Sequence, residues 1–316
     1  MNSASKMLFQ YNLYFVFLSL TAIISAIVAF GAWQRRKTNS VSEPFILMML
    51  AIAFYATVAA MEAGAIALLD KIFWSKLEYL GSGSVITLFL IFAIHFTNKR
   101  QWLTSRNTAL LWIIPAFNVA MVATNEWHNL IWTGFLLDPH QSNVVIYRHG
   151  IGFFCVMTCV YIYTLAGVLL LTKRALLPSA LYRQQSKIAL IGALIPLVGG
   201  SAYMLCLTPP GLNVTPMSFM LTGLIYAVSV FRFRMFDLVP VAQDILIERM
   251  SDGVLVLDVQ NRILDINPAA QNLIGTTAHL IGQPVDQVMS ILPDNIISYH
   301  EYECVKSLPP CFIIDN

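Results

Sequence analysis

Charged residues are scarce in this sequence. Asp, Glu, Lys and Arg make up 11% of its 316 residues, whereas hydrophobic residues make up 57%. A soluble globular domain carries roughly 25% charged residues. So few charges leave too little polar surface for a soluble protein of this length. The composition therefore predicts a membrane protein, with the lipid bilayer as its main surroundings.

Cysteine is also rare, and none of the five cysteines falls in a segment that we expect on the extracellular side. Cys155, Cys159 and Cys206 lie in apolar stretches, and Cys304 and Cys311 lie near the C-terminus. A disulfide framework needs paired cysteines in an oxidising compartment. The pattern therefore argues against a disulfide-stabilised extracellular domain.

The sequence lacks the residues that several classes of membrane protein need for their function. The last apolar segment has no lysine, so no retinal Schiff base can form there. The apolar segments hold no Ser and His, paired Asp or HExxH arrangement for an intramembrane protease. Paired repeats with broken helices, common in transporters, are not found. No cleavable signal is expected, because the first apolar segment is long and ends in basic residues.

What the sequence does contain is a series of seven apolar segments, each close to the length of about 20 residues that crosses a bilayer. The seven segments are Tyr11–Trp33, Pro44–Leu68, Trp74–Thr97, Asn107–Thr124, Gly150–Thr172, Ile188–Leu207 and Thr215–Phe233, and the fourth is the shortest. We therefore expect an all-α membrane fold, a seven-transmembrane helix bundle over residues 1–236.

Basic residues are concentrated in alternate connections. Those after the odd-numbered segments hold Arg35, Arg36, Lys37, Lys99, Arg100, Arg106, Lys173, Arg174, Arg183, Lys187, Arg232 and Arg234. The opposite side holds Lys6, Lys71, Arg148 and the interfacial Lys76. Lys and Arg collect in cytoplasmic loops. The distribution predicts a multi-pass protein of the plasma membrane with its N-terminus outside and its C-terminus in the cytoplasm.

Acidic residues interrupt the second and third apolar segments. Glu62 lies near the outer end of the second, and Lys76 and Glu78 lie near the start of the third. Ionisable groups inside a bilayer are costly and mark functional sites by default. Because a short outer turn joins the two segments, we expect these three residues to meet. Ser82 follows Glu78 by four residues and so shares its helix face.

Two interpretations of these groups are open. In the first, Glu62, Glu78 and Ser82 line a polar cavity that opens outward and binds a small ligand, with Lys76 near its mouth. In the second, the charges form a structural Glu–Lys pair that serves helix packing. The residue pattern does not choose between them.

The longest outer connection, Asn125–Gly150, is rich in aromatic residues and histidines. Its aromatics form either a belt at the membrane surface or a lid over the cavity. If the connection is a lid, Trp132 is the fifth candidate ligand-binding residue, with Glu62, Lys76, Glu78 and Ser82. The spacing of the histidines fits no standard zinc pattern, so we predict no metal ligand. These histidines are His128, His140 and His149.

The stretch Ser251–Gly275 differs from everything before it, because apolar and polar residues alternate. "DGVLVLD" predicts a strand, and "NRILDINPAAQNLIG" predicts a turn, a second strand and a helix. Asn267 suits the N-cap of that helix and Pro268 its first position. A small α+β module is therefore expected after the bundle.

Three segments carry a family resemblance. "FWSKLEYLGSGSVITLFLIFAIHFT" and "HNLIWT…VVIYRHGIGFFCVMTCVYIYTLAGVLLL" resemble parts of the seven-helix N-terminal sensory region of bacterial histidine kinases. "FRFRMFDLVPVAQDILIERMSDGVLVLD" resembles the junction between that region and a PAS domain. The likeness to the sensory region covers about residues 10–240. Asn267, Pro268 and Ala269 match the Asn-Pro-Ala of PAS domains.

The resemblance implies the sensory input portion of a two-component receptor that works as a homodimer. It implies a linker helix at 237–250 and a cytosolic PAS-like module at 251–316; it names no cofactor. Because only part of the PAS strand pattern is found, we expect this module to be incomplete, with "CFIIDN" as its third strand.

No phosphoacceptor helix or ATP-binding motif follows, so we expect the chain itself to show no autophosphorylation. The expected partners are the lipid bilayer, a small-molecule ligand or membrane stimulus, and a second copy of the chain, but no nucleic acid. A small-solute transporter or channel with a cytosolic regulatory domain is the alternative function.

Overall fold

The computed structural model describes residues 9–34, 41–137, 143–176, 180–231, 251, 253–257, 260–274, 280, 282–285, 299–302 and 311–314. The chain divides into two compact units, Met1–Phe236 and Asp237–Asn316. Each unit has a hydrophobic core of its own. The linker helix predicted at 237–250 lies outside the described residues.

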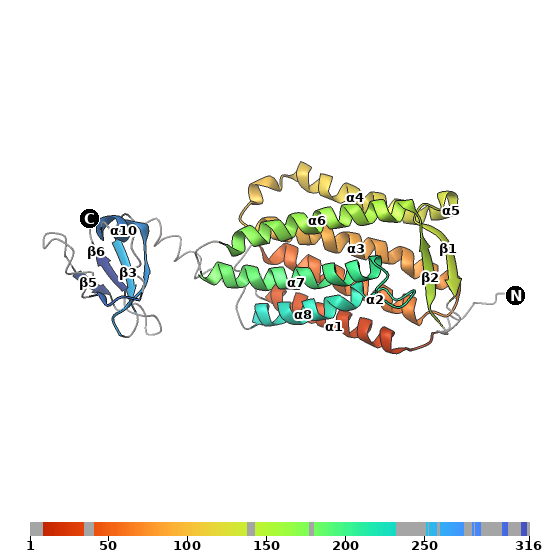
Figure 1. Cartoon of the computed structure of the whole chain (residues 1–316), viewed down its shortest axis with the longest axis horizontal. Helices are drawn as coiled ribbons and strands as arrows, with labels where there is room; N and C mark the ends of the chain where they lie inside the picture. The colour runs from red at the N-terminus through yellow and green to blue at the C-terminus, as the bar shows by residue number, and fades with distance from the viewer. Residues whose placement is uncertain are drawn as a thin grey trace. The chain divides into compact units, whose positions relative to one another are not determined.

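The first unit is a bundle of long apolar helices (Figure 1). Among the described residues, six helices are long and apolar enough to cross a membrane: α1 (Leu13–Gln34), α2 (Ser42–Gly64), α3 (Leu68–Phe96), α4 (Ser105–Ala123), α6 (Ile151–Ala175) and α7 (Ala180–Met204). A further apolar helix, α8 (Thr215–Phe231), is shorter, with 17 residues. Two short helices, η2 (Arg100–Trp102) and α5 (Asn125–His128), lie in connections. The helical membrane fold predicted from composition is confirmed.

The largest differences from the predicted segments are at three helix ends: α2 ends at Gly64 rather than Leu68, α3 begins at Leu68 rather than Trp74, and α7 begins at Ala180 rather than Ile188. Hydropathy marks the residues that tolerate lipid, whereas a helix ends where its backbone hydrogen bonds end. After Gly64 the chain turns extended at Ala65 (φ −63°, ψ 144°). Glu78 therefore lies ten residues after the start of α3, about 15 Å along its axis.

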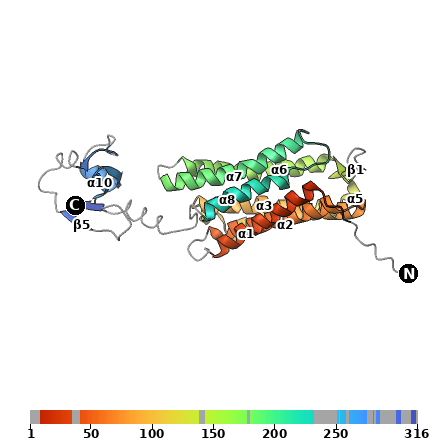
Figure 2. The same ribbon diagram turned by 90° about the horizontal axis from the view of Figure 1, so that it is seen from below.

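Helices α2 and α3 are the most deeply buried of the long apolar helices described. Helix α8 contacts α1 on one side and α7 on the other, while α3 contacts α2 and α6 (Figure 2). The rings of Phe45, Phe92 and Tyr226 meet in the core, with centroids 5.4 and 5.6 Å apart. On α1, by contrast, Ile27 and Phe30 are exposed. An apolar outer face is what a bilayer solvates.

Glycine permits the close contact between α2 and α3. A Cβ atom at Gly81 would lie 2.9 Å from the Cα of Tyr55, closer than real Cβ atoms come to a neighbouring backbone. Small residues of this kind let transmembrane helices approach each other closely. The faces of α2 and α3 that carry Tyr55 and Glu78 are thereby held near each other.

One end of the bundle carries an antiparallel hairpin of β1 (Trp132–Leu137) and β2 (Val145–His149) (Figure 1). Buried Asn125 organises it: its Oδ1 accepts from the backbone N–H groups of Ile131 and Trp132 at 2.9 and 3.1 Å. Its Nδ2 donates to the Trp132 carbonyl at 3.0 Å. The aromatic outer connection predicted from sequence is therefore partly a small sheet. The basic α3–α4 and α6–α7 connections lie at the opposite end of the bundle.

The second unit contains β3 (Gly253–Leu257), β4 (Ile263–Ile266), α10 (Pro268–Ile274), β5 (Tyr299–Tyr302) and β6 (Cys311–Ile314). The predicted strand, turn, strand and helix are confirmed, and the Asn267 Oδ1 caps α10 by accepting from the Ala270 N–H at 2.9 Å. The sheet order is β4-β3-β6-β5. "CFII" is thus the fourth described strand rather than the third, because β5 precedes it and pairs with it.

Candidate functional site

A cavity of about 210 Å³ lies among the helices of the first unit. It extends from the β1–β2 hairpin and the connection at 211–213 to core residues such as Tyr226. Its polar lining residues are Tyr14, Tyr55, Glu62, Ser75, Glu78, Tyr79, Ser82, Asn118, Trp132, Tyr147, His149, Tyr161, Thr164, Tyr203, Asn213, Thr215, Thr222 and Tyr226. A cavity of roughly 150 Å³ is large enough for benzene, so this one suits a small molecule.

Glu62 has a complete set of partners at the hairpin end of the cavity. The Lys71 Nζ lies 3.8 Å from its Oε1 and donates to its backbone carbonyl at 2.8 Å. The Tyr147 hydroxyl donates to the same Oε1 at 2.9 Å. The Lys71 side chain is only 1% exposed. Glu62 is therefore held in a buried ion pair that ties α2, α3 and β2 together.

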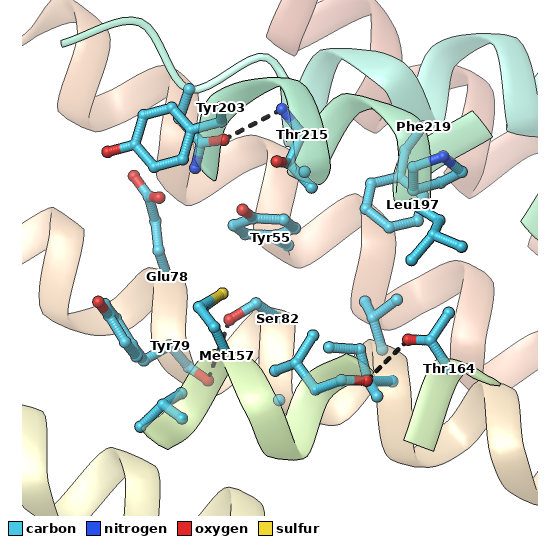
Figure 3. Close-up of a pocket in the computed structure, with 18 of the residues that line it drawn as sticks. Tyr55, Glu78, Tyr79, Ser82, Met157, Thr164, Leu197, Tyr203, Thr215 and Phe219 are labelled. Atoms are coloured by element: carbon cyan, nitrogen blue, oxygen red, sulfur yellow. Dashed lines mark hydrogen bonds between the residues drawn. The ribbon is translucent and has the colours of Figure 1, made fainter. Parts of the chain in front are cut away.

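Glu78 has a different environment. It lines the cavity together with Ser75 and Ser82, three residues before it and four after it on α3. In the part of the chain that the structure describes, no hydrogen bond or ion pair to its carboxylate is found. Figure 3 shows its side chain reaching from α3 toward Tyr203 of α7, with Tyr55 and Tyr79 nearby. Glu78 is thus an acidic group that faces the cavity without a partner among the described residues.

Aromatic rings form much of the wall around the two carboxylates. Trp132 is 2% exposed and packs edge-on against Tyr79, with ring centroids 5.6 Å apart. Its centroid lies 5.5 Å from that of Tyr147. The Asn125 hydrogen bonds fix the Trp132 backbone, so the hairpin presents this ring to the cavity. The lid position expected for Trp132 is the one that the structure shows, although its contact with a ligand stays a prediction.

His149, at the end of β2, joins the hairpin to α7. Its Nε2 and the Tyr203 hydroxyl share a hydrogen bond of 2.8 Å, and its ring stacks on Phe153 at 3.6 Å. Burial lowers the pKa of His149 to about 4. The imidazole is therefore neutral near pH 7 and adds no positive charge to the cavity.

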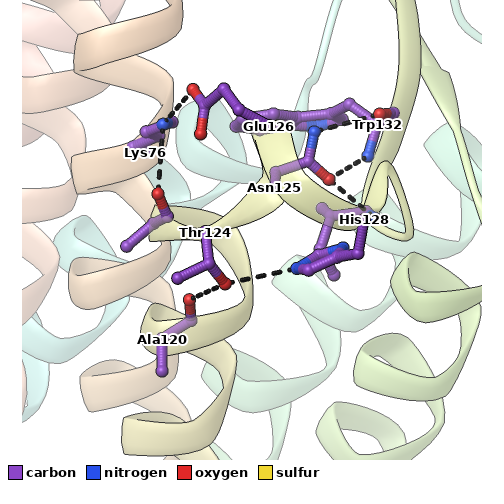
Figure 4. A network of polar contacts seen from close by, with 9 residues as sticks. Lys76, Ala120, Thr124, Asn125, Glu126, His128 and Trp132 are labelled. Atoms are coloured by element: carbon purple, nitrogen blue, oxygen red, sulfur yellow. Dashed lines mark hydrogen bonds and ion pairs between the residues drawn. The ribbon is translucent and has the colours of Figure 1, made fainter.

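Lys76 lies outside the cavity lining. Its ammonium group pairs with the Glu126 carboxylate of α5 and donates to the Ala123 carbonyl (Figure 4). The hydrogen bond from Lys76 lowers the pKa of Glu126. Glu62 and Glu78 share the cavity as expected, but the cation that meets Glu62 is Lys71. The earlier start of α3 explains the difference, because it places Lys71 beside the end of α2.

Sequence reasoning missed Lys71, Asn125, Tyr55 and Tyr203 as parts of this region. The sequence analysis treated Lys71 only as a basic residue of the outer side. Its position shortly after Glu62, across the turn between the second and third segments, could have indicated that the two side chains pair. Tyr55 and Tyr203 gave a weaker signal, since a tyrosine in a membrane helix combines an apolar ring with a polar hydroxyl. Nothing local predicted that two distant helices would bring them to Glu78.

Comparison with known families follows the same division of the chain. Residues 17–240 match the family described as the N-terminal 7TM region of histidine kinase. Residues 243–307 match a PAS domain family. No curated protein matches the chain. The first match covers well over half of the sequence and includes every residue of the cavity except Tyr14.

Proposed function

The chain belongs to the family of the N-terminal 7TM region of histidine kinase, and from that membership we propose that its bundle is a receptor for a small ligand. With the PAS domain that follows, the chain is a membrane sensory input portion of a two-component system. We propose residues 1–236 as the seven-transmembrane sensory domain, 237–250 as the linker helix and 251–316 as a PAS-like module.

The observation that carries the proposal is the Glu78 carboxylate, which faces a cavity and has no ion-pair or hydrogen-bond partner among the described residues. A charge in the membrane is costly, by at least about 2.5 kcal/mol on the most lenient scale. A structural role would leave such a group paired, as Glu62 is paired with Lys71. A ligand that completes the site would supply the missing partner.

Helices α7 and α8 are the proposed route from the cavity to the PAS module. The Thr222 hydroxyl of α8 donates to the Gly192 carbonyl of α7 at 2.9 Å, and both residues line the cavity. Tyr226, one turn further along α8, donates to the Ala189 carbonyl at 3.0 Å. A ligand in the cavity would shift the packing of α8 on α7. Helix α8 is the last described helix before the PAS module, so this shift would reach the signalling side.

We propose that the hairpin end of the bundle faces the exterior and that the PAS module lies in the cytoplasm. The support is the charge distribution. The α3–α4 connection, with Lys99 and Arg100, and the last turn of α6, with Lys173 and Arg174, belong to the end of the bundle opposite the hairpin. The proposal also includes a homodimer, which the family resemblance implies.

A cysteine-labelling experiment tests the receptor role without knowledge of the natural stimulus. The chain is fused to an intact histidine kinase core, Ser82 is replaced by cysteine, and a membrane-impermeant methanethiosulfonate-ethyltrimethylammonium reagent is added to whole cells. Labelling at Ser82→Cys should change kinase output, because the attached group fills the cavity. Glu126→Cys is the control at an accessible position, since the Glu126 side chain lies on α5, is 61% exposed and is outside the cavity lining.

Labelling of Ser82→Cys with no change in output would contradict the receptor role. The parent chain, which keeps Cys155, Cys159 and Cys206, shows how much of any effect comes from native cysteines. Uptake of labelled choline into proteoliposomes that contain the purified chain would instead favour a small-solute transporter.

A further inference from the structure

The charges around the cavity do not balance. Of the residues that line it in the described part of the chain, Glu62 and Glu78 are acidic and none is Lys or Arg. Lys71, which is not part of the lining, pairs with Glu62: its Nζ lies 3.8 Å from the Glu62 Oε1. His149 contributes no charge near pH 7. Among the described residues, the Glu78 carboxyl group is therefore left without a cation paired to it.

We infer that the cavity binds a small organic cation, an amine or quaternary ammonium compound, with its cationic group beside the Glu78 carboxylate. The inference rests on the proposed receptor function and names the class of its ligand. An ammonium group would pair with the one acidic group of the site that has no cation beside it among the described residues. It would also give the carboxylate the partner that the described protein groups do not provide.

The aromatic wall supports an organic cation rather than a metal ion. Tyr55, Tyr79 and Tyr203 surround the Glu78 side chain (Figure 3). The face of an aromatic ring attracts ammonium groups and is the usual wall of sites for quaternary ammonium ligands. Calcium and magnesium ions instead need six or more oxygen ligands, including water. No group of three or more His, Cys, Asp or Glu side chains that could hold a metal ion occurs among the described residues.

The same charge distribution excludes ligands that carry a carboxylate. An amino acid or a betaine would need a cationic partner for its carboxylate group. Lys71 is already engaged by Glu62, and Lys76 by Glu126. Among the described residues that line the cavity there is no other cation to meet it. We therefore expect amines without an acidic group, of a size that fits about 210 Å³.

Binding to the purified full chain in detergent tests the inference with matched probes. Choline, butylammonium and 2-phenylethylammonium are the cations. The neutral isostere of choline, 3,3-dimethylbutan-1-ol, and its carboxylate analogue, glycine betaine, are the controls. At least one cation should bind at millimolar concentration, as measured by calorimetry and by quenching of tryptophan fluorescence. The two choline controls should bind at least about tenfold more weakly than choline, because they lose the charge attraction or add repulsion.

Variants assign the binding to the named residues. Glu78→Gln should weaken cation binding at least about tenfold, whereas Glu126→Gln, the same change outside the cavity, should leave it unaltered. Tyr203→Leu should weaken binding by about 2- to 30-fold, and Tyr203→Phe, which keeps the ring, should weaken it less. Because Tyr203→Leu and Tyr203→Phe keep Glu78, they test the site even if Glu78→Gln fails to fold.

Three results would overturn the inference: no binding by any of the three cations, equal binding of choline and its neutral isostere, or unchanged affinity in folded Glu78→Gln. Failure of the receptor role is a separate outcome. In that case the cations bind the purified chain, but labelling at Ser82→Cys leaves kinase output unchanged.

Discussion

At the scale of single residues, two glutamates on neighbouring helices have the same chemistry and different surroundings. Glu62 accepts a hydrogen bond from Tyr147 and pairs with Lys71. Glu78 faces the cavity, and the described protein groups offer it no such contact. Glu62 therefore has the surroundings of a structural pair, whereas a ligand role for Glu78 stays a prediction.

Removal of Lys71 should destabilise the bundle. Lys71→Met leaves the Glu62 carboxylate buried without its cation, which typically costs about 3–5 kcal/mol of the free energy of unfolding. The double variant Glu62→Gln/Lys71→Met removes both charges and should recover most of that loss. Thermal unfolding of the purified chain in detergent measures both effects. Equal stability of Lys71→Met and wild type would show that the pair contributes nothing to the fold.

His149 should make the stability of the bundle sensitive to pH. Burial lowers its pKa from the ordinary value of 6.5 to about 4. The unfolded chain therefore takes up a proton at a higher pH than the folded chain does. As the pH falls from about 6.5 toward 4, the free energy of unfolding should decrease by this contribution; above about 6.5 it is fully present.

His149→Gln removes this titration and should reduce the difference between the unfolding midpoints at pH 7 and pH 5. The control is His128→Gln, because His128 lies on α5 outside the cavity lining. A midpoint difference as large in His149→Gln as in wild type would contradict the assignment.

At the scale of elements, α3 organises the site. Its first turn supplies Lys71 to Glu62, its third turn supplies Glu78, and Gly81 lets it approach α2. The β1–β2 hairpin adds Trp132 and Tyr147 from a different part of the chain. The cavity therefore depends on the spacing between α3 and its neighbours.

Gly81→Ala should disturb the α2–α3 contact. The added Cβ would lie 2.9 Å from the Tyr55 Cα, and a backbone atom cannot rotate away as a flexible side chain can. We expect a loss of about 1–3 kcal/mol, the usual cost of overpacking. Gly200→Ala is the matched control, because its nearest neighbour would be a Thr215 side-chain atom at 3.6 Å. Similar thermal unfolding of the two variants would contradict the close contact at Gly81.

At the scale of the whole molecule, the chain joins a lipid-facing bundle to a small α+β unit. The two have separate hydrophobic cores. Six long apolar helices and the shorter α8 precede the PAS unit in the chain. Whether α8 crosses the membrane decides on which side that unit lies.

Fusions to a reporter that is active only in the cytoplasm test this arrangement. Fusions after Arg106, Lys187 and Arg234 should be active, and those after Asp70 and Asn213 should be silent, because basic connections stay in the cytoplasm. The pair at Asn213 and Arg234 brackets α8. Equal activity at these two positions would remove α8 as a span.

The sequence by itself determined the membrane class, the helices and the kind of module that follows, because these depend on local composition and periodicity. Of the five predicted ligand residues, Glu62, Glu78, Ser82 and Trp132 line the cavity and Lys76 does not; that any of them binds a ligand stays a prediction. The predicted contact between Lys76 and Glu62 was wrong, because hydropathy does not locate the residue at which a helix starts. The strand order of the α+β unit was likewise not readable from the chain.

Only the tertiary structure decided which side chains meet. Tyr55, Tyr203 and Glu78 come from α2, α7 and α3, and Lys71 rather than Lys76 reaches Glu62. Local patterns carry no information on such contacts, because helix packing depends on the fit of whole surfaces in three dimensions. That packing left one carboxylate paired and the other facing a cavity, which no single segment could have shown.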